Sequence, residues 1–545
     1  MADFSRGRAR QPKPQHQARH DGPHRQAQGG PSRARPDHRD TRKGSFRQKQ
    51  RDAAERGPRS SGVGPRSAPH PRSAHGPDPR KLGWAVLRRV SPGDVLEGAV
   101  LAEFRHQGLD TSMLHRVLPM LEDASRFGML FDHLIGHVAT RPAGALDADV
   151  RAALHLYLAW FLLDDPKAVY AHGQAAVDLL SDVHTARGFV NACVRRLSEL
   201  LKVENVPPDD YRAMAAAGKI PEFWRDRCRL GAGRITRAER AIFADFATAP
   251  ATHLAQTCGL PEDFVNRLIE QHGLNAACMV ALSAVEKTPT WLRANTLKTS
   301  PEGLKHILSL RGIEATQQSR AIALPVGTRD FDQLGIFETG LAYVQDFSAQ
   351  QVAPAVGARQ GDKILDLCAA PGGKATHLAE LTTERAKILA VDVSLEKIER
   401  IQENIARLGY TSIATAAADA LTVKFPEPFD RVLLDAPCSN SGVLARRVEA
   451  RHRLTPGKLK ELGEMQRKML ENAAANLKPG GTLVYSVCSV LMEEGMDVTR
   501  AFIEARQPGT SHTREDGGWA IEEEKVVLPV PAWHDGTYFC RLKAP

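Results

Sequence analysis

The stretch KILDLCAAPGGKATHLAEL, residues 363–381, decides the fold of this chain. Residues 364–367 form a short, mostly apolar run that is typical of a strand buried on both faces. Pro371–Gly373 break this run, and residues 374–381 then show helical spacing. A strand, a glycine turn and a helix in this order predict the opening unit of a doubly wound nucleotide-binding sheet, with the ligand at the carboxyl end of the strand.

The same pattern repeats downstream, with acidic residues at the ends of strands. Residues 388–392 (ILAVD) predict a second strand, and a helical run over 394–408 follows it. Residues 429–435 (FDRVLLD) and 477–486 supply further strands. Strands and helices that alternate at these lengths predict a parallel sheet with right-handed crossovers.

Three motifs in this region resemble those of the RNA cytosine-5 methyltransferases that use S-adenosylmethionine. They are DLCAAPGGK at 366–374, LLDAPCSNSGVLARR at 433–447 and LVYSVCS at 483–489. Within that family the chain is most similar to the bacterial small-subunit ribosomal RNA methyltransferase B group, which has a NusB-like N-terminal domain. The similarity extends from about Leu82 onward, and three motifs in the same order argue against coincidence.

The resemblance and the apolar spacing together predict a multidomain chain. In the region between the helical part and the methyltransferase part, we expect a helix over Ala238–Phe246. The expected parts are a disordered basic tail at 1–81, an all-α NusB-like RNA-binding bundle at 82–204, a helical linker at 205–287, a small α+β RNA-binding subdomain at 288–345 and a Rossmann-like α/β methyltransferase domain at 346–545.

The charge of the chain is unevenly placed. The formal net charge is +9, and residues 1–81 hold 20 Lys and Arg against 7 Asp and Glu, so the remainder is slightly acidic. The tail is rich in Arg, Pro, Gly and Ser and almost free of apolar residues, which predicts disorder. The tail either binds RNA phosphates without sequence preference or acts as a solubilising extension, and the sequence leaves both interpretations open.

Several classes of protein are disfavoured by the sequence. No run approaches the length of a membrane span, and the tail has no apolar segment of the secretory type. The eight cysteines are scattered without CxxC pairs or metal-ligand spacing. We therefore expect a cytoplasmic protein without disulfides, bound metal or membrane partner. The resemblance implies RNA and S-adenosylmethionine as its ligands, and we expect a monomer.

Methylation at C5 of cytosine requires a nucleophile, because C5 by itself is too weak to attack a methylsulfonium. A thiolate that adds to C6 places electron density on C5, and a base must later remove the C5 proton. Cys438 follows the fourth strand and Cys488 follows the fifth. The residues alone do not rank the two cysteines. The family resemblance implies that Cys488 is the nucleophile and that Cys438 helps to release the product.

The resemblance also implies roles for charged residues at the same edge of the sheet. Asp435 would hold the cytosine. Lys374 lies at a helix start, where a cation is unfavourable with the helix dipole, so the sequence itself suggests that it pairs with Asp435 or with the carboxylate of the cofactor, and a surface lysine is the alternative. Asp392 would bind ribose hydroxyls and Asp419 the adenine amino group, with a turn or helix cap as the alternative role for each. Cys368 is expected chiefly to pack. The predicted catalytic residues are Cys488, Cys438, Asp435 and Lys374, and the predicted cofactor-binding residues are Cys368, Ala369, Ala370, Pro371, Gly372, Gly373, Lys374, Asp392, Asp419 and Asp435.

Arginines in three regions are candidates for binding RNA phosphate. Their alternative roles are a salt-bridged surface, packing against the sheet and a solvated helix face. The target base must leave its stack to meet a thiolate, so we expect single-stranded or loosely paired RNA. The predicted RNA-binding residues are Arg446, Arg447 and Arg451 after Cys438, Arg293 in the small subdomain, and Arg195 and Arg196 in the helix of residues 186–197.

The sequence therefore favours methyl transfer from S-adenosylmethionine to C5 of a cytosine in small-subunit (16S) ribosomal RNA. The same chemistry on tRNA is an alternative, although a NusB-like front domain favours ribosomal RNA. A DNA cytosine-5 methyltransferase would use the proline-adjacent Cys438 as its nucleophile. A non-catalytic RNA-binding scaffold would have lost Cys488, Asp435 or Lys374, and none of the three is lost.

Overall fold

The described part of the chain lies in the unit of residues 74–545. The computed structural model describes residues 78–90, 93–108, 113–181, 184–328, 334–506 and 518–545. The expected tail at 1–81 therefore lies outside the described residues up to position 77. Asp78 caps helix α1 (Pro79–Leu87) by accepting a hydrogen bond from the backbone of Arg80, so the last residues assigned to the tail are helical instead.

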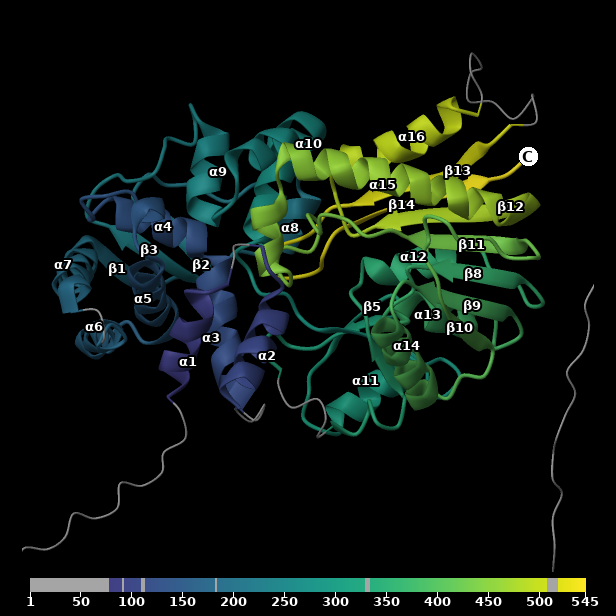
Figure 1. Cartoon of the computed structure of the whole chain (residues 1–545), viewed down its shortest axis with the longest axis horizontal. Helices are drawn as coiled ribbons and strands as arrows, with labels where there is room; N and C mark the ends of the chain where they lie inside the picture. The colour runs from purple at the N-terminus through teal and green to yellow at the C-terminus, as the bar shows by residue number, and fades with distance from the viewer. Residues whose placement is uncertain (1–77, 91–92, 109–112, 182–183, 329–333, 507–517) are drawn as a thin grey trace, which may run out of the picture. The chain divides into compact units, whose positions relative to one another are not determined.

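A seven-stranded sheet carries the C-terminal part of the chain (Figure 1). Its order is β10-β9-β8-β11-β12-β14-β13, and the first five strands run parallel, as predicted. Strand β14 is antiparallel to both of its neighbours. The strands are β8 (Lys363–Leu367), β9 (Lys387–Asp392), β10 (Ile413–Ala417), β11 (Phe429–Asp435), β12 (Leu477–Val487), β13 (Ala520–Val527) and β14 (Thr537–Lys543).

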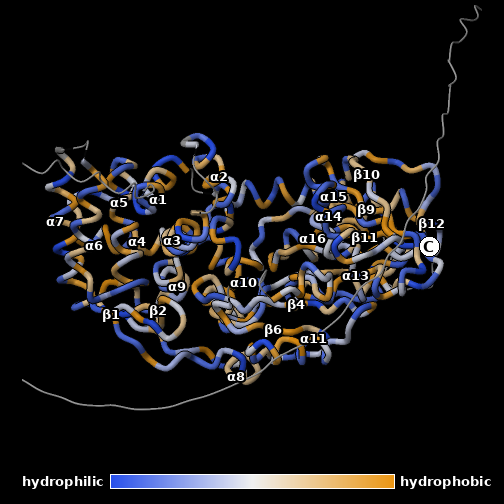
Figure 2. The backbone as a smooth tube through the Cα atoms, turned by 90° about the horizontal axis from the view of Figure 1, so that it is seen from below, coloured by the Kyte–Doolittle hydropathy of each residue, from blue (hydrophilic) through white to orange (hydrophobic). Residues whose placement is uncertain are grey.

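Helices cover both faces of this sheet because its strands are apolar on both faces. Ile364 of β8 packs with α12, α13 and α14, whereas Leu365 and Leu367 pack with α15 and α16. The hydrophobic runs of β9 and β11 are drawn in orange in Figure 2. The covering helices are α12 (Val352–Ala355), α13 (Gly373–Leu381), α14 (Leu395–Leu408), α15 (Pro456–Ala475) and α16 (Met496–Glu504).

The strand order places a topological switch point between β8 and β11. The chain proceeds from β8 to β9 and β10 on one side, and returns to β11 and β12 on the other. Leu434 of β11 is in register with Leu367 of β8, and Asp435 is in register with Ser486 of β12. Ligands of open parallel sheets bind outside the carboxyl ends of strands at such a point. The three sequence motifs, at 366–374, 433–447 and 483–489, therefore lie together at the carboxyl edge of the sheet.

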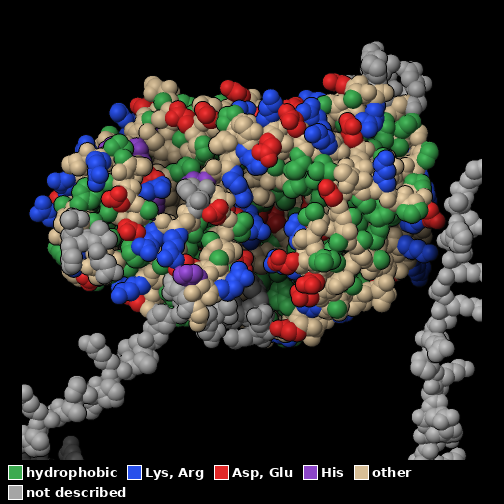
Figure 3. All heavy atoms as spheres, viewed as in Figure 1, with side chains coloured by type: hydrophobic (Ala, Val, Ile, Leu, Met, Phe, Trp, Pro, Cys, Tyr) green, Lys and Arg blue, Asp and Glu red, His purple; other side chains and the backbone are tan. Residues whose placement is uncertain are grey.

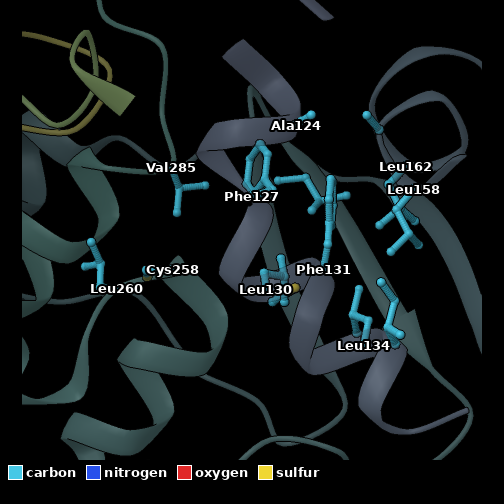
Figure 4. Close-up of a cluster of buried hydrophobic side chains, with 14 of the residues drawn as sticks. Ala124, Phe127, Leu130, Phe131, Leu134, Leu158, Leu162, Cys258, Leu260 and Val285 are labelled. Carbon is cyan, nitrogen blue, oxygen red and sulfur yellow. The ribbon is translucent and has the colours of Figure 1, made fainter. Parts of the chain in front are cut away.

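The N-terminal part is helical from Pro79 to Leu200, in line with the apolar spacing of the sequence. Figure 4 shows part of its core, where Phe131 and Leu134 of α4 lie near Leu158 and Leu162. The helices are α1, α2 (Leu96–Gln107), α3 (Leu114–Arg126), α4 (Gly128–Gly136), α5 (Ala148–Ala159), the π-helical turn η3 (Trp160–Asp164), α6 (Val169–Asp178) and α7 (His184–Leu200).

The prediction of a purely helical linker at 205–287 is wrong. This region contributes two strands to a three-stranded antiparallel sheet, and residues 239–249 after it form turns, not the expected helix over Ala238–Phe246. In β3 the exposed Arg237 lies between the buried Thr236 and Ala238. The alternation of buried and exposed residues in β3 is short, and the residues that follow it have helical spacing, so the sequence pattern predicted a helix instead of a strand. The elements are β1 (Leu201–Asn205), α8 (Tyr211–Ala216), β2 (Arg227–Gly231), β3 (Arg234–Ala238), α9 (Pro250–Cys258) and α10 (Glu262–Ser283).

The region at 288–345 forms a small α+β module, as the sequence predicts. Its sheet has the order β5-β6-β4-β7, and Leu304 and Leu308 of its helix pack on Leu292 and Ile322. The elements are β4 (Trp291–Ala294), α11 (Pro301–Ser309), β5 (Thr316–Gln318), β6 (Ala321–Ala323) and β7 (Ala342–Val344).

The described residues contain neither a membrane-spanning helix nor a cluster of metal-binding side chains. Among the helices of the described residues, none combines the length and the apolar character needed to cross a bilayer. In the same residues, no three His, Cys, Asp or Glu side chains are grouped so that they could hold a metal ion.

Candidate active site

The turn between β8 and α13 is shaped by close packing of protein against its glycines. Gly372 has φ of +96°, and a Cβ there would lie 3.2 Å from Cγ2 of Ile401. A Cβ on Gly373 would lie 3.0 Å from the ring of Tyr343. The positive φ and these two contacts both require glycine. The glycines thus let α14 and Tyr343 approach the turn, a role that the motif alone did not reveal.

Lys374 and Asp435 form an ion pair at the ends of β8 and β11. Nζ of Lys374 lies 2.5 Å from Oδ2 of Asp435, and Oδ1 of Asp435 accepts a hydrogen bond of 2.7 Å from the Ser486 hydroxyl. Burial acts to lower the pKa of Lys374, but the charges of Asp435 and Cys488 outweigh it and hold that pKa above its ordinary value. The charged lysine is therefore retained inside the site, in the pairing that the sequence suggested.

Asp366 is a site residue that the sequence analysis missed. It lies in the middle of β8, is fully buried, and neither of its carboxyl oxygens has a hydrogen-bond partner among the described residues. Burial, together with the nearby charge of Asp435, raises its pKa to about 8, although Lys374 opposes the shift. The available signal was a carboxyl group within an otherwise apolar strand, since such a group is costly to bury without a partner.

The eight cysteines divide into two groups, and all of them lie in the described residues as free thiols. Five are buried, while Cys368, Cys438 and Cys488 are partly exposed. Cys488 is the one cysteine whose pKa is lowered, first by a hydrogen bond from the Cys438 thiol and then by the charge of Lys374, against burial. The same hydrogen bond, followed by burial, raises the pKa of Cys438. The pair thus favours a thiolate on Cys488 and a thiol on Cys438.

Comparison with known proteins places this site in a family. Residues 353–543 match the family described as 16S rRNA methyltransferase RsmB/F. Ribosomal RNA small subunit methyltransferase B of Citrobacter koseri is 33% identical over 313 residues, which cover 56% of this chain and 70% of that relative. The chain belongs to the RsmB/F family. Members of this family are S-adenosylmethionine-dependent methyltransferases of ribosomal RNA.

Two further comparisons extend this finding. Ribosomal RNA small subunit methyltransferase B of Shewanella oneidensis is 37% identical over 268 residues, which cover 47% of this chain. The match spans 60% of the length of that relative. The crystal structure of a protein named PH0851 has a TM-score of 0.59 at 22% identity, and the match covers 86% of this chain and 99% of that one. This structure shares the fold of the chain.

The acids at the strand ends fit the cofactor of the RsmB/F family. Asp392 is buried at the end of β9, where it accepts hydrogen bonds from the backbone of Ala370 (3.1 Å) and Val393 (2.7 Å) and pairs with Lys397 (3.0 Å). Asp419 is exposed after β10, and its Oδ1 accepts a bond from the backbone of Leu421. Asp419 therefore has a local turn-capping role, whereas Asp392 holds the turn that contains Ala370; both keep lone pairs for ribose or adenine donors.

Two of the arginines expected at RNA are structural, and those two predictions are wrong. Arg293 is 3% exposed and pairs with Glu380, and it also donates to Gln345 and to the backbone of Gly373. The hydrogen-bond donors of its guanidinium are occupied by these contacts, which connect the small α+β module to α13. This outcome matches the packing alternative that the sequence left open for Arg293.

Arg451 is fully buried and binds backbone carbonyls at the ends of three helices. It donates to the carbonyl of Arg126 at the end of α3, to Gly259 (3.0 Å) after α9 and to Ala284 (3.0 Å) after α10. The partial negative charge of helix C-termini takes the place of a carboxylate partner. Arg451 therefore anchors the loop after Cys438 to the helical region.

The other arginines keep exposed side chains to different extents. Arg446 donates to Asp535 (2.6 Å) and to the backbone of Pro289 (2.7 Å), so most of its guanidinium is committed to protein. Arg447 is exposed and makes no ion pair within the described residues. Arg195 and Arg196 are exposed on α7. On the face drawn in Figure 3, Lys and Arg side chains are interspersed with Asp and Glu.

Proposed function

We propose that the chain transfers a methyl group from S-adenosylmethionine to C5 of a cytosine in small-subunit (16S) ribosomal RNA, through a covalent bond between Cys488 and C6. The observation that carries the proposal is the placement of two partly exposed cysteines after the neighbouring strands β11 and β12, beside the Lys374–Asp435 pair. Cys488 has a lowered pKa and Cys438 a raised one, and both follow strands beside the Lys374–Asp435 pair. Family membership supplies the substrate class.

The first step in this proposal is addition of the Cys488 thiolate to C6. The Sγ–C6 bond forms and the electrons of the C5–C6 double bond move toward C5 and N3. The carboxylate of Asp435 would accept a hydrogen bond from the cytosine amino group, while Lys374, which pairs with that carboxylate, offsets the charge that develops on the ring. The cofactor, when bound, supplies an electrophilic methyl group.

The second step restores the ring. C5 takes the methyl group, its proton leaves, the C5–C6 double bond reforms and the Sγ–C6 bond breaks, which returns Cys488 as a thiolate. We assign proton removal to Cys438. Once Cys488 is bonded to carbon it carries no charge, so the main influence that raises the pKa of Cys438 is gone. The Cys438 thiol then releases its proton to water, and the resulting thiolate takes the C5 proton and returns to the thiol form.

The cofactor in this proposal lies over the carboxyl ends of β8, β9 and β10. Asp392 would receive the ribose hydroxyls and Asp419 the adenine amino group, and the turn at 368–374 would line the opposite side. Asp366, with its raised pKa, would offer a neutral carboxyl group beneath this turn. RNA would reach this edge of the sheet past Arg447. Because the proposed substrate is ribosomal RNA, we expect the enzyme in the cytoplasm, and we expect it to be a monomer.

Two cysteine variants test the proposal. Cys488→Ala should lower methyl transfer by at least about 10⁴-fold, because the covalent route is lost. Cys438→Ala should trap a protein–RNA adduct, because release is blocked after the first step. Incubation with 16S ribosomal RNA and S-adenosylmethionine, followed by a denaturing gel, shows the adduct directly.

The controls are built into the same experiment. Cys540→Ala removes a fully buried thiol of β14 and should neither trap RNA nor abolish transfer. An adduct in the Cys488 variant instead of the Cys438 variant would reverse the two roles. Transfer to tRNA in place of 16S ribosomal RNA would keep the chemistry and replace the substrate.

A further inference from the structure

A fully buried carboxylate lies behind the two cysteines and has no part in the reaction described above. Glu494 ends the short helix η7 (Met492–Glu494) and is 0% exposed. Its Oε1 accepts hydrogen bonds from the backbone of Ser439 (2.8 Å) and from the side chain of Gln466 (3.2 Å). Its Oε2 accepts from the hydroxyls of Ser439 (2.5 Å) and Ser489 (2.6 Å). The burial of this charge is thus compensated by four donors.

The donors come from the residues that directly follow the two cysteines in the sequence. Ser439 follows Cys438, and Ser489 follows Cys488. One carboxylate therefore bridges the turn after β11 and the turn after β12. Charge-assisted bonds to both turns restrict their separation and their rotation more strongly than neutral contacts would.

Two further contacts extend the same bridge. The hydroxyl of Ser441 lies 2.7 Å from that of Ser489, and the backbone of Gly442 donates to the carbonyl of Cys488 over 3.1 Å. Gln466 of α15 also donates to the carbonyl of Pro437, directly before Cys438. Both cysteines between these contacts remain partly exposed.

We propose that Glu494 is a positioning residue that holds the two cysteine turns in register and makes the two thiols unequal in reactivity. The inference rests on the proposed function, because it assigns a cause to the unequal roles of the two cysteines. Glu494 touches neither substrate nor cofactor in this account. It acts through Ser439 and Ser489 and through its charge.

The charge of Glu494 favours the same division of roles. The pKa of Cys438 is raised first by its hydrogen bond to Cys488 and by burial, and the negative charge of Glu494 adds to the rise. The influences on the pKa of Cys488 are instead dominated by Cys438, burial, Asp435 and Lys374. An anion nearer to one member of a thiol pair disfavours the thiolate on that member, so the proton stays on Cys438.

The test compares the reactivity of the two thiols in the full chain without RNA. Iodoacetamide at pH 7.5 reacts with thiolates, and mass spectrometry of the two cysteine peptides gives the ratio of Cys488 to Cys438 alkylation rates. Glu494→Gln keeps the size of the side chain and removes its charge, and Glu494→Ala removes both. We expect the ratio to fall at least tenfold in Glu494→Gln and further in Glu494→Ala.

The matched control is the neighbouring Glu493→Gln. The Glu493 side chain forms an ion pair with Arg267 and accepts a hydrogen bond from Gln271 of α10, and it bonds neither Ser439 nor Ser489, so this variant should keep the ratio within twofold of the wild type. S-adenosylhomocysteine binding and the melting temperature check that each variant is folded. If Glu494→Ala does not fold, Glu494→Gln and the double variant Ser439→Ala/Ser489→Ala carry the test.

The outcomes separate this inference from the proposed function. A ratio within twofold of the wild type in Glu494→Gln overturns it, even if the melting temperature falls, because Glu494 would then be only structural. A reduced ratio with a proportional loss of adduct formation on RNA supports it. Failure of the wild type to methylate any RNA would reject the proposed function, while the thiol ratio would still report whether Glu494 sets the proton position.

Discussion

At the scale of single residues, the environment of a side chain decides its chemistry in this protein. Asp366 and Asp435 are both carboxyl groups on neighbouring strands. Asp435 has Lys374 and Ser486 as partners, whereas Asp366 has no hydrogen-bond partner among the described residues and its pKa is raised to about 8. Asp366 is therefore largely protonated at neutral pH.

Replacing Asp366 should change how stability depends on pH. The folded pKa of about 8 lies above the ordinary value of 3.8, so the contribution of Asp366 to stability is full below about pH 4 and is lost as pH rises through about 8. Asp366→Asn removes this loss. We expect the melting temperature of the variant, relative to wild type, to rise by about 3 °C or more between pH 4 and pH 8.

Differential scanning fluorimetry across this pH range checks the prediction. Asp497→Asn is the control for replacing an acid by its amide, because Asp497 is exposed on α16 and is not among the charged groups around Asp366. A flat difference for Asp366→Asn would show that Asp366 keeps an ordinary pKa in the folded protein.

Arg447 is the arginine of the loop after Cys438 that remains available to RNA. Arg447→Ala should weaken RNA binding and reduce the slope of log affinity against log salt by about one, since one phosphate contact is lost. Filter binding with 16S ribosomal RNA at several salt concentrations measures both. Arg447→Lys retains the charge and should restore most of the slope, whereas an unchanged slope in Arg447→Ala would remove this residue from the interface.

At the scale of elements, the turns after β11 and β12 are in direct backbone contact. Gly442 lies where they meet, and a Cβ on it would be 2.6 Å from the carbonyl oxygen of Gly536 and 3.1 Å from that of Cys488. Backbone atoms on both sides leave no flexible group to move aside. The distance between the two cysteines therefore depends on the absence of a side chain at position 442.

Gly442→Ala should separate the two turns. We expect the free energy of unfolding to fall by about 2 kcal/mol, because overpacking against backbone strains both turns. The hydrogen bond between Cys438 and Cys488 should weaken, so the reaction of Cys488 with iodoacetamide should slow. Urea denaturation and alkylation rates measure these effects.

Gly457→Ala provides the comparison for this variant. Gly457 lies at the start of α15 with no atom within 4 Å of an added Cβ, and alanine favours a helix. This variant should be neutral or slightly more stable than the wild type. A loss of stability equal to that of Gly442→Ala would show that the effect has no connection with the turn contact.

At the scale of the whole molecule, Arg451 joins the helical region to the active-site loop. Its guanidinium binds carbonyls at the C-terminal ends of α3, α9 and α10, and the nearby Arg126 donates to the carbonyl of Ala445 (2.8 Å). Burial and the charge of Arg126 lower the pKa of Arg451 to about 9. The loop that begins at Cys438 therefore depends on helices more than 150 residues earlier in the chain.

Arg451→Met should destabilise the protein by about 3 kcal/mol, because several buried carbonyls lose their donor. The change should also lower methyl transfer, since the loop after Cys438 loses its anchor. Arg447→Met is the control, and its exposed side chain should change the free energy of unfolding by less than about 0.5 kcal/mol. Equal effects of the two variants would contradict a structural role for Arg451.

The sequence predicted the parts of the site that depend on local order along the chain. A strand, a turn and a helix at 363–381, the acids at strand ends and the two cysteines after β11 and β12 are all consequences of local pattern, and the structure has them where the pattern places them. The Lys374–Asp435 pair was also foreseen, because a cation at a helix start requires a partner.

The sequence pattern did not predict the roles of residues whose exposure and contacts depend on distant parts of the chain. Arg451 and Arg447 belong to one basic run in the sequence, yet one is fully buried and the other exposed. Glu493 and Glu494 are adjacent acids, yet only Glu494 bridges the cysteine turns. The strands at 201–238 were missed because short alternation on a small sheet is weaker than the helical spacing beside it.

The sequence by itself determined the α/β sheet, the order of its motifs and the pair of thiols at its edge, because apolar periodicity and turn residues act over a few positions. Only the tertiary structure decided which thiol loses its proton, which arginines reach the solvent and which acids stay neutral. Those properties depend on burial and on charges that the fold brings together from distant segments, and no local pattern encodes them.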